Sequence, residues 1–177
     1  RNLCSLRKNV LKIPGQLLAI SEFLKNQSYV NQEPIHMMGY SFGATFVPVT
    51  YIIAQQKKFQ LGLGVMAYGG ANLYCLFKAN LPLPRFLKGL IAKVGAAIFK
   101  PIDPILYAPK MKGDFLFVNG VFDRKVPLEC AKQLQNLVSE PKTIINLETI
   151  HMHPDNMDIN LQLIQISRSW IEKKRLK

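Results

Sequence analysis

The chain has 177 residues, of which 49% are hydrophobic and 19% are charged, and its formal net charge is +12. This composition is typical of one globular domain with a buried core, and it excludes an intrinsically disordered chain. The three cysteines, Cys4, Cys75 and Cys130, lie far apart and form no Cys-x-x-Cys pair. We therefore expect neither a disulfide framework nor a zinc ribbon, and we favour a reducing, cytoplasmic location.

Hydrophobic periodicity predicts helices and strands that alternate along the chain. Apolar residues at helical spacing predict a first helix over residues 8–26, broken or shifted at Pro14-Gly15. Short apolar runs predict buried strands, and helical patterns follow them. The strands are expected at residues 35–38, 61–68, 115–118 and 143–147, and the later helices at residues 41–56, 127–138 and 155–172. This alternation predicts an α/β fold, a three-layer sandwich with a mainly parallel sheet.

Positive charge gathers between the second and third expected strands. Residues 78–112 carry seven basic side chains against Asp103 alone, and apolar residues at helical spacing within 87–98 predict an amphipathic helix with a basic face. One interpretation is a solvated helix that covers a core. Another is an element that lies on an anionic membrane or guides an acidic or acyl substrate. Nucleic-acid binding is not expected, because no helix-turn-helix, RNP or zinc-finger pattern accompanies the charge.

The segment Gly39-Tyr40-Ser41-Phe42-Gly43 lies between an expected strand and an expected helix. A G-x-S-x-G sequence in this context is typical of a nucleophile elbow, in which a strained turn exposes the serine hydroxyl. Small residues are expected on both sides of the turn, at Gly39 and Gly43. The backbone amide of Phe42 would then face a developing oxyanion. The alternative is a glycine-rich turn in which Ser41 only caps the helix.

A serine hydroxyl needs a base and an orienting acid before it becomes a good nucleophile. Asp123 follows the third expected strand and His151 follows the fourth. Because the carboxyl ends of parallel strands meet at one edge of a sheet, we expect both side chains to lie near Ser41. Alone, Asp123 would be interpreted as a loop carboxylate that satisfies backbone amides or pairs with Arg124 or Lys125, and His151 as a partly buried loop histidine.

A metal site is the competing interpretation of the same loop. His151, His153 and Asp155 have a His-x-His-x-Asp spacing that binds zinc in some hydrolases. A catalytic zinc needs at least three protein ligands. The only other histidine is His36, and no cysteine cluster supports it, so no metal is expected.

Four segments of the chain resemble the C-terminal two thirds of an α/β-hydrolase, and within that superfamily they are similar to the dienelactone hydrolase and acetyl-esterase-like branches. These segments are Gly39 to Gly43, Asp103 to Pro109, Asn119 to Pro127 and His151 to Pro154. The resemblance implies that Ser41 is the nucleophile, that His151 is the general base and acid, and that Asp123 orients His151. It further implies one domain over residues 1–177, with residues 72–110 forming a cap.

The chain departs from this family in two places. Ile150 stands where glycine commonly precedes the histidine, which leaves His151 and His153 as alternatives for the base. Residues 1–34 contain no His-Gly-Gly-type segment that would supply a second oxyanion amide. We therefore expect a fragment or variant in which the N-terminal strands and the oxyanion loop are absent.

These observations favour a serine hydrolase that cleaves carboxylic esters or thioesters with an apolar acyl group and uses no cofactor. Acyl transfer to an alcohol other than water would use the same three residues. The alternatives are a metal-dependent hydrolase built on His151 and His153, and an inactive hydrolase-fold protein whose basic cap faces a membrane or a partner. The sequence leaves the substrate and the oligomeric state open.

Overall fold

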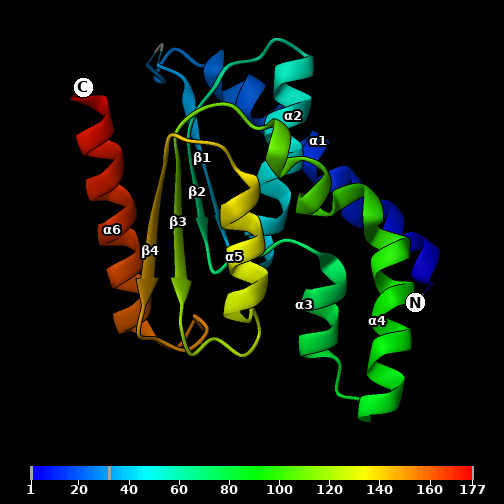
Figure 1. Ribbon diagram of the computed structural model, residues 1–177. Coiled ribbons are helices and arrows are strands. Elements are labelled where there is room, and N and C mark those ends of the chain that lie inside the picture. The colour runs from blue at the N-terminus through cyan, green and yellow to red at the C-terminus, as the bar shows by residue number, and fades with distance from the viewer. Residues whose placement is uncertain (1, 32, 177) are drawn as a thin grey trace.

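A parallel four-stranded sheet forms the centre of the computed structural model, which describes residues 2–31 and 33–176 (Figure 1). The strands are β1 (Ile35–Tyr40), β2 (Leu61–Ala67), β3 (Phe115–Gly120) and β4 (Lys142–Leu147), and they lie in that order. Every neighbouring pair is parallel, and one row of paired residues runs across the sheet through Gly39, Met66, Phe117 and Ile144. The four carboxyl ends therefore reach the same edge of the sheet.

Helices cover both faces of this sheet because strand side chains alternate between the two faces. On β3, Phe115 and Phe117 pack in a cluster with α1 (Leu3–Lys25), α2 (Phe46–Gln56) and α5 (Leu128–Leu137). Leu116 and Val118 instead pack against α6 (Met157–Arg175). Figure 1 shows α6 alone on one side of the sheet and the other three helices on the opposite side. The predicted three-layer α/β sandwich is confirmed.

The basic segment between β2 and β3 leaves the sheet as two helices, α3 (Leu73–Asn80) and α4 (Arg85–Phe99). Three short 3₁₀ turns then lead back to β3, at Lys100–Ile102, Pro104–Leu106 and Ala108–Lys110. Asp103, the only acidic residue between positions 78 and 112, is buried, and its carboxylate accepts hydrogen bonds from the backbone N–H groups of Asn72 and Leu73. This contact ties the return of the segment to the start of α3. That residues 72–110 form a cap stays a prediction.

The predicted break at Pro14 is wrong, because α1 continues through it as one helix. An interior proline removes one backbone hydrogen bond and costs about 3 kcal/mol. Pro14 is buried in the structure, and the neighbouring Leu17 packs against the sheet core. Tertiary packing of this face offsets the local cost. The predicted helix over residues 41–56 also differs in detail, since it begins as a 3₁₀ helix (Ser41–Thr45) before α2.

The cysteines behave differently from the sequence expectation. A disulfide links Cys75 on α3 to Cys130 on α5, while Cys4 is free and exposed. Disulfides persist in oxidising environments and are rare in the cytosol. The reducing compartment was favoured because no disulfide was expected, and the Cys75–Cys130 pairing removes that argument. The cytoplasmic location stays a prediction.

Among the helices within residues 2–31 and 33–176, none is both long enough and apolar enough to span a membrane.

Candidate active site

Ser41 occupies a strained turn directly after β1. Its backbone φ is +52°, in the left-handed region that residues with a side chain rarely adopt. The 3₁₀ helix (Ser41–Thr45) starts at this residue and leads into α2. Phe42 lies in the first turn of this helix, where backbone N–H groups have no acceptor within the helix. The turn thus combines a half-buried serine with an adjacent backbone N–H that has no acceptor within the helix, as expected for a nucleophile elbow.

The two glycines that flank Ser41 differ in how much space the structure leaves for a side chain. A Cβ atom at Gly39 would lie 2.6 Å from Cγ2 of Val47, 2.7 Å from Cα of Ala44 and 2.7 Å from the carbonyl oxygen of Gly43. Two of these neighbours are backbone atoms, so they cannot move aside without changing the turn. A Cβ atom at Gly43 would meet nothing within 4 Å. The sequence expectation of a steric need on both sides holds at Gly39 and is wrong at Gly43.

Replacing Gly39 with alanine should therefore destabilise the protein by about 1 to 3 kcal/mol, the usual cost of overpacking. Gly43→Ala is the matched control, and its free energy of unfolding should stay within about 0.5 kcal/mol of the unmodified protein. Urea unfolding of both variants measures the difference. Equal losses at the two positions would contradict the steric argument.

A continuous chain of hydrogen bonds joins the three predicted site residues. Ser41 Oγ lies 2.7 Å from Nε2 of His151, and Nδ1 of His151 lies 2.6 Å from Oδ2 of Asp123. An ionised carboxylate can only accept hydrogen bonds, so the Nδ1 nitrogen carries the proton and donates a hydrogen bond to Asp123. The unprotonated Nε2 then accepts a hydrogen bond from the Ser41 hydroxyl. The arrangement is that of a serine activated by an oriented imidazole.

Asp123 is held rigidly in the loop after β3. Its side chain is only 1% exposed, and its second oxygen, Oδ1, accepts the backbone N–H groups of Lys125 at 2.8 Å and Val126 at 2.9 Å. These backbone donors neutralise part of the cost of burying a carboxylate. The alternative of a loop carboxylate that satisfies backbone amides is therefore met by Oδ1, while Oδ2 contacts His151. In the described part of the chain Asp123 forms no ion pair with Arg124 or Lys125, so that half of the alternative is wrong.

Tyr68 and Thr149 also contact this site, although the sequence analysis did not single them out. The Tyr68 ring meets the His151 ring edge to face, with 5.5 Å between centroids, and its hydroxyl lies 2.5 Å from Oγ1 of Thr149. Burial raises the pKa of Tyr68 above its usual value and the charge of Asp123 raises it further, while the hydrogen bond with Thr149 opposes both. Tyr68 therefore stays protonated near neutral pH and packs as a neutral wall beside His151.

The position of Tyr68 offered a signal that could have identified it. Tyr68 directly follows β2 and precedes Gly69-Gly70, so it lies at the same sheet edge as Ser41. Its φ of +52° is a second strained backbone position at this edge. A strand end followed by two glycines is a place where side chains of a site are expected in parallel sheets.

A cavity of about 230 Å³ opens beside Ser41 and His151. Its walls are mostly apolar and come from the turn after β1, from α3 and from the loop that holds Asp123. The apolar wall residues are Phe42, Tyr68, Leu73, Leu76, Phe77 and Val126. The cavity suits a small apolar group placed next to the serine hydroxyl. A larger cavity of about 640 Å³ lies along the other side of α3 and includes neither Ser41 nor His151.

The second histidine of the loop lies outside the hydrogen-bonded chain. His153 is exposed, and its Nδ1 atom lies 3.3 Å from Oδ2 of Asp155. Within residues 2–31 and 33–176, no group of three or more His, Cys, Asp or Glu side chains is placed to hold a metal ion. Of the two histidines that the sequence left open, it is His151 that contacts Ser41.

Comparisons with known proteins place this geometry in a family. The model of the prolyl oligopeptidase family matches residues 8–173. No curated protein matches the chain in sequence.

Solved structures share the fold at low sequence identity. An acetyl xylan esterase from Thermoanaerobacterium sp. JW/SL YS485 is 16% identical with a TM-score of 0.59, over 86% of this chain and 50% of that one. An esterase from Pyrococcus furiosus is 17% identical with a TM-score of 0.63, over 89% and 60%. An acylaminoacyl peptidase from Pyrococcus horikoshii is 18% identical with a TM-score of 0.52, over 76% and 21%. The chain thus spans about half to three fifths of the two esterases, and its fold is that of the C-terminal portion of an α/β-hydrolase.

Proposed function

The chain belongs to the prolyl oligopeptidase family of serine hydrolases, and from this premise we propose that it cleaves carboxylic esters or thioesters through Ser41, His151 and Asp123. The observation that carries the proposal is the continuous hydrogen-bonded chain from Ser41 Oγ through the His151 ring to Asp123. Neither a packed loop histidine nor a serine that only caps a helix would need this connection.

The proposed reaction has two steps. His151 Nε2 takes the hydroxyl proton as Ser41 Oγ attacks the carbonyl carbon, and the Phe42 N–H donates to the oxyanion. The tetrahedral intermediate then collapses to an acyl-enzyme, and the leaving alcohol or thiol takes the proton from His151. Water repeats the sequence: His151 removes its proton, the acid is released, and Ser41 regains its hydrogen. This chemistry needs no cofactor, and an alcohol in place of water would give acyl transfer.

The apolar cavity supports a preference for substrates with a small apolar acyl group. Leu73, Leu76 and Phe77 of α3 form the wall that such a group would contact, and the volume of about 230 Å³ limits its length. Of the three solved structures described above, two are esterases and one is an acylaminoacyl peptidase. Aminoacyl anilides should therefore be measured beside p-nitrophenyl esters of increasing acyl length.

Labelling with a fluorophosphonate probe tests the proposal directly. The probe phosphonylates an activated serine, and mass spectrometry identifies the modified residue. We expect the label at Ser41 and its loss in Ser41→Ala and His151→Ala. His153→Ala is the matched control, because His153 is exposed and outside the hydrogen-bonded chain, and it should be labelled like the unmodified protein.

Two outcomes would contradict this assignment. A folded chain without label, confirmed by circular dichroism, would favour the alternative of a hydrolase-fold binding protein. Hydrolysis that a chelator abolishes while the probe leaves it intact would favour the metal-dependent alternative.

A further inference from the structure

The outer face of α4 is apolar and exposed to solvent. Five large apolar side chains of this helix have between 37% and 81% of their surface exposed. They are Phe86, Leu87, Leu90, Ile91 and Val94. Because their spacing is one, four, five and eight residues from Phe86, they lie along one side of the helix. We call this set the α4 stripe.

The opposite side of α4 makes the contacts that hold the helix in the fold. Ala92 is fully buried, and a Cβ atom at Gly95 would lie 3.1 Å from the Phe77 ring of α3. The Phe77 and Phe99 rings also meet edge to face, with 6.1 Å between centroids. The packing of α4 is therefore complete without the stripe. A contiguous apolar surface of this kind in a folded protein usually marks a binding surface.

The exposed charges on the segment that carries the α4 stripe have one sign. Arg85, Lys93 and Lys100 of the same segment and Lys78 of α3 are solvent-accessible. Asp103 is the only acidic residue between positions 78 and 112, and it is 7% exposed with its carboxylate used by backbone N–H groups. The surface that surrounds the stripe is therefore cationic and has no exposed carboxylate of its own segment. Such a surface attracts an anionic partner.

We propose that the α4 stripe and its flanking cations dock this protein on an anionic lipid bilayer. Apolar side chains in a narrow stripe beside Lys and Arg are the pattern of helices that lie in the membrane interface. α4 has 15 residues and is about 22 Å long, less than the roughly 30 Å of a bilayer core. It would lie parallel to the surface, with Phe86, Leu90 and Val94 below the headgroups.

The location of α4 in the molecule permits this contact. Figure 1 shows α4 on the outer side of the fold, away from α6, with its first turn beyond the ends of the strands. A second copy of the chain is a weaker fit, because lysines of like charge would face each other across such an interface. The proposal does not rest on the proposed hydrolase activity.

Flotation with lipid vesicles tests the docking. The purified chain is mixed with vesicles of phosphatidylcholine alone or of phosphatidylcholine with phosphatidylserine. We expect binding to the phosphatidylserine vesicles, weakening as salt is raised. Phe86→Ser/Leu90→Ser should lower the binding constant at least about tenfold, since two apolar groups would no longer leave water. Lys93→Gln should lower it about fivefold, the usual effect of one basic residue near an anionic surface.

The matched control replaces two exposed apolar residues by serine on α6, on the opposite side of the sheet. Leu161 and Ile164 are exposed on α6, and Leu161→Ser/Ile164→Ser should bind vesicles like the unmodified chain. Circular dichroism checks that each variant is folded. Absence of binding to folded protein, or equal losses in the α4 and α6 variants, would overturn the proposal. So would a dimer in sedimentation that Phe86→Ser/Leu90→Ser dissociates, because the stripe would then belong to a second copy.

Discussion

Ser41→Ala and His151→Ala are each expected to lower kcat for ester hydrolysis by about 10⁵- to 10⁶-fold, and the double variant should lose no more. The reason is that the hydroxyl and the imidazole, 2.7 Å apart, act as one unit in which either is ineffective alone. Initial rates with a p-nitrophenyl ester of short acyl length give kcat for the three variants, and titration of active sites corrects for trace contaminants.

His153→Ala supplies the control for this series, because it removes a neighbouring imidazole and leaves the hydrogen-bonded chain intact. Its kcat should match that of the unmodified protein. Losses that add in the double variant would mean that the two side chains act independently. A large loss in His153→Ala would mean that the loop rearranges to use the other histidine.

Asp123→Asn should lower kcat by about 10⁴-fold while the fold is kept. The carboxamide oxygen can still accept the N–H groups of Lys125 and Val126, which hold the loop. Its NH₂ group, however, would face Nδ1 of His151, 2.6 Å away, where a carboxylate oxygen now accepts a hydrogen bond from Nδ1–H. The imidazole would then favour the tautomer with the proton on Nε2, and this tautomer cannot take the Ser41 proton.

The measurement is kcat for the same ester, together with the free energy of unfolding. Asp155→Asn is the control, since Asp155 is an exposed carboxylate that pairs with the outer histidine, His153. An Asp123→Asn variant that keeps its rate would show that orientation by the carboxylate is not needed. A comparable loss in Asp155→Asn would point to a general effect of charge in the loop.

The sequence was enough to predict that the three site residues lie together, because their proximity follows from the order and direction of the strands. Ser41, Asp123 and His151 each follow a strand, and the carboxyl ends of parallel strands meet at one sheet edge. Alternating strand and helix patterns are enough to predict that edge. The sequence could not decide between His151 and His153, because the two residues are two positions apart in one loop. The conformation of that loop decides which ring contacts the serine.

Features that depend on tertiary packing could not be predicted in the same way. Cys75 and Cys130 are 55 residues apart, and only the docking of α3 against α5 brings them together. The continuity of α1 through Pro14 depends on its burial against neighbouring helices. The spare room at Gly43 is a matter of which atoms surround one Cβ position. In each case the deciding fact is the three-dimensional surroundings of the residue, which the local sequence pattern does not contain.

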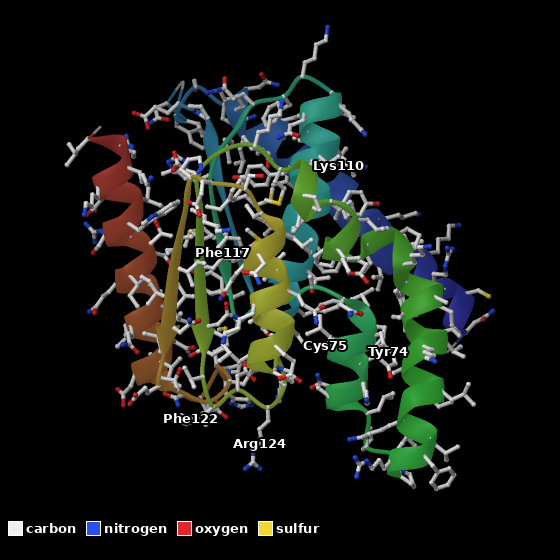
Figure 2. All side chains as sticks on the ribbon, viewed as in Figure 1. Tyr74, Cys75, Lys110, Phe117, Phe122 and Arg124 are labelled. Carbon is white, nitrogen blue, oxygen red and sulfur yellow. A yellow bond between two sulfur atoms is a disulfide. The ribbon has the colours of Figure 1, made fainter. Side chains whose placement is uncertain are left out.

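The covalent link between α3 and α5 restricts how the cavity can open. Figure 2 places Cys75 on the side of α3 that faces α5, while other residues of α3 line the cavity beside Ser41. A lid that swings as one piece from the end of β2 would have to break this bond. The connection of residues 81–84 between α3 and α4 lies beyond Cys75, so a hinge there would leave the disulfide intact. Because α3 forms one wall of the cavity beside Ser41 and is fixed to α5, a ligand that fits this cavity loses little affinity to ordering that wall. If the ligand is an acyl group, the fixed wall would select it by size whether or not α4 moves.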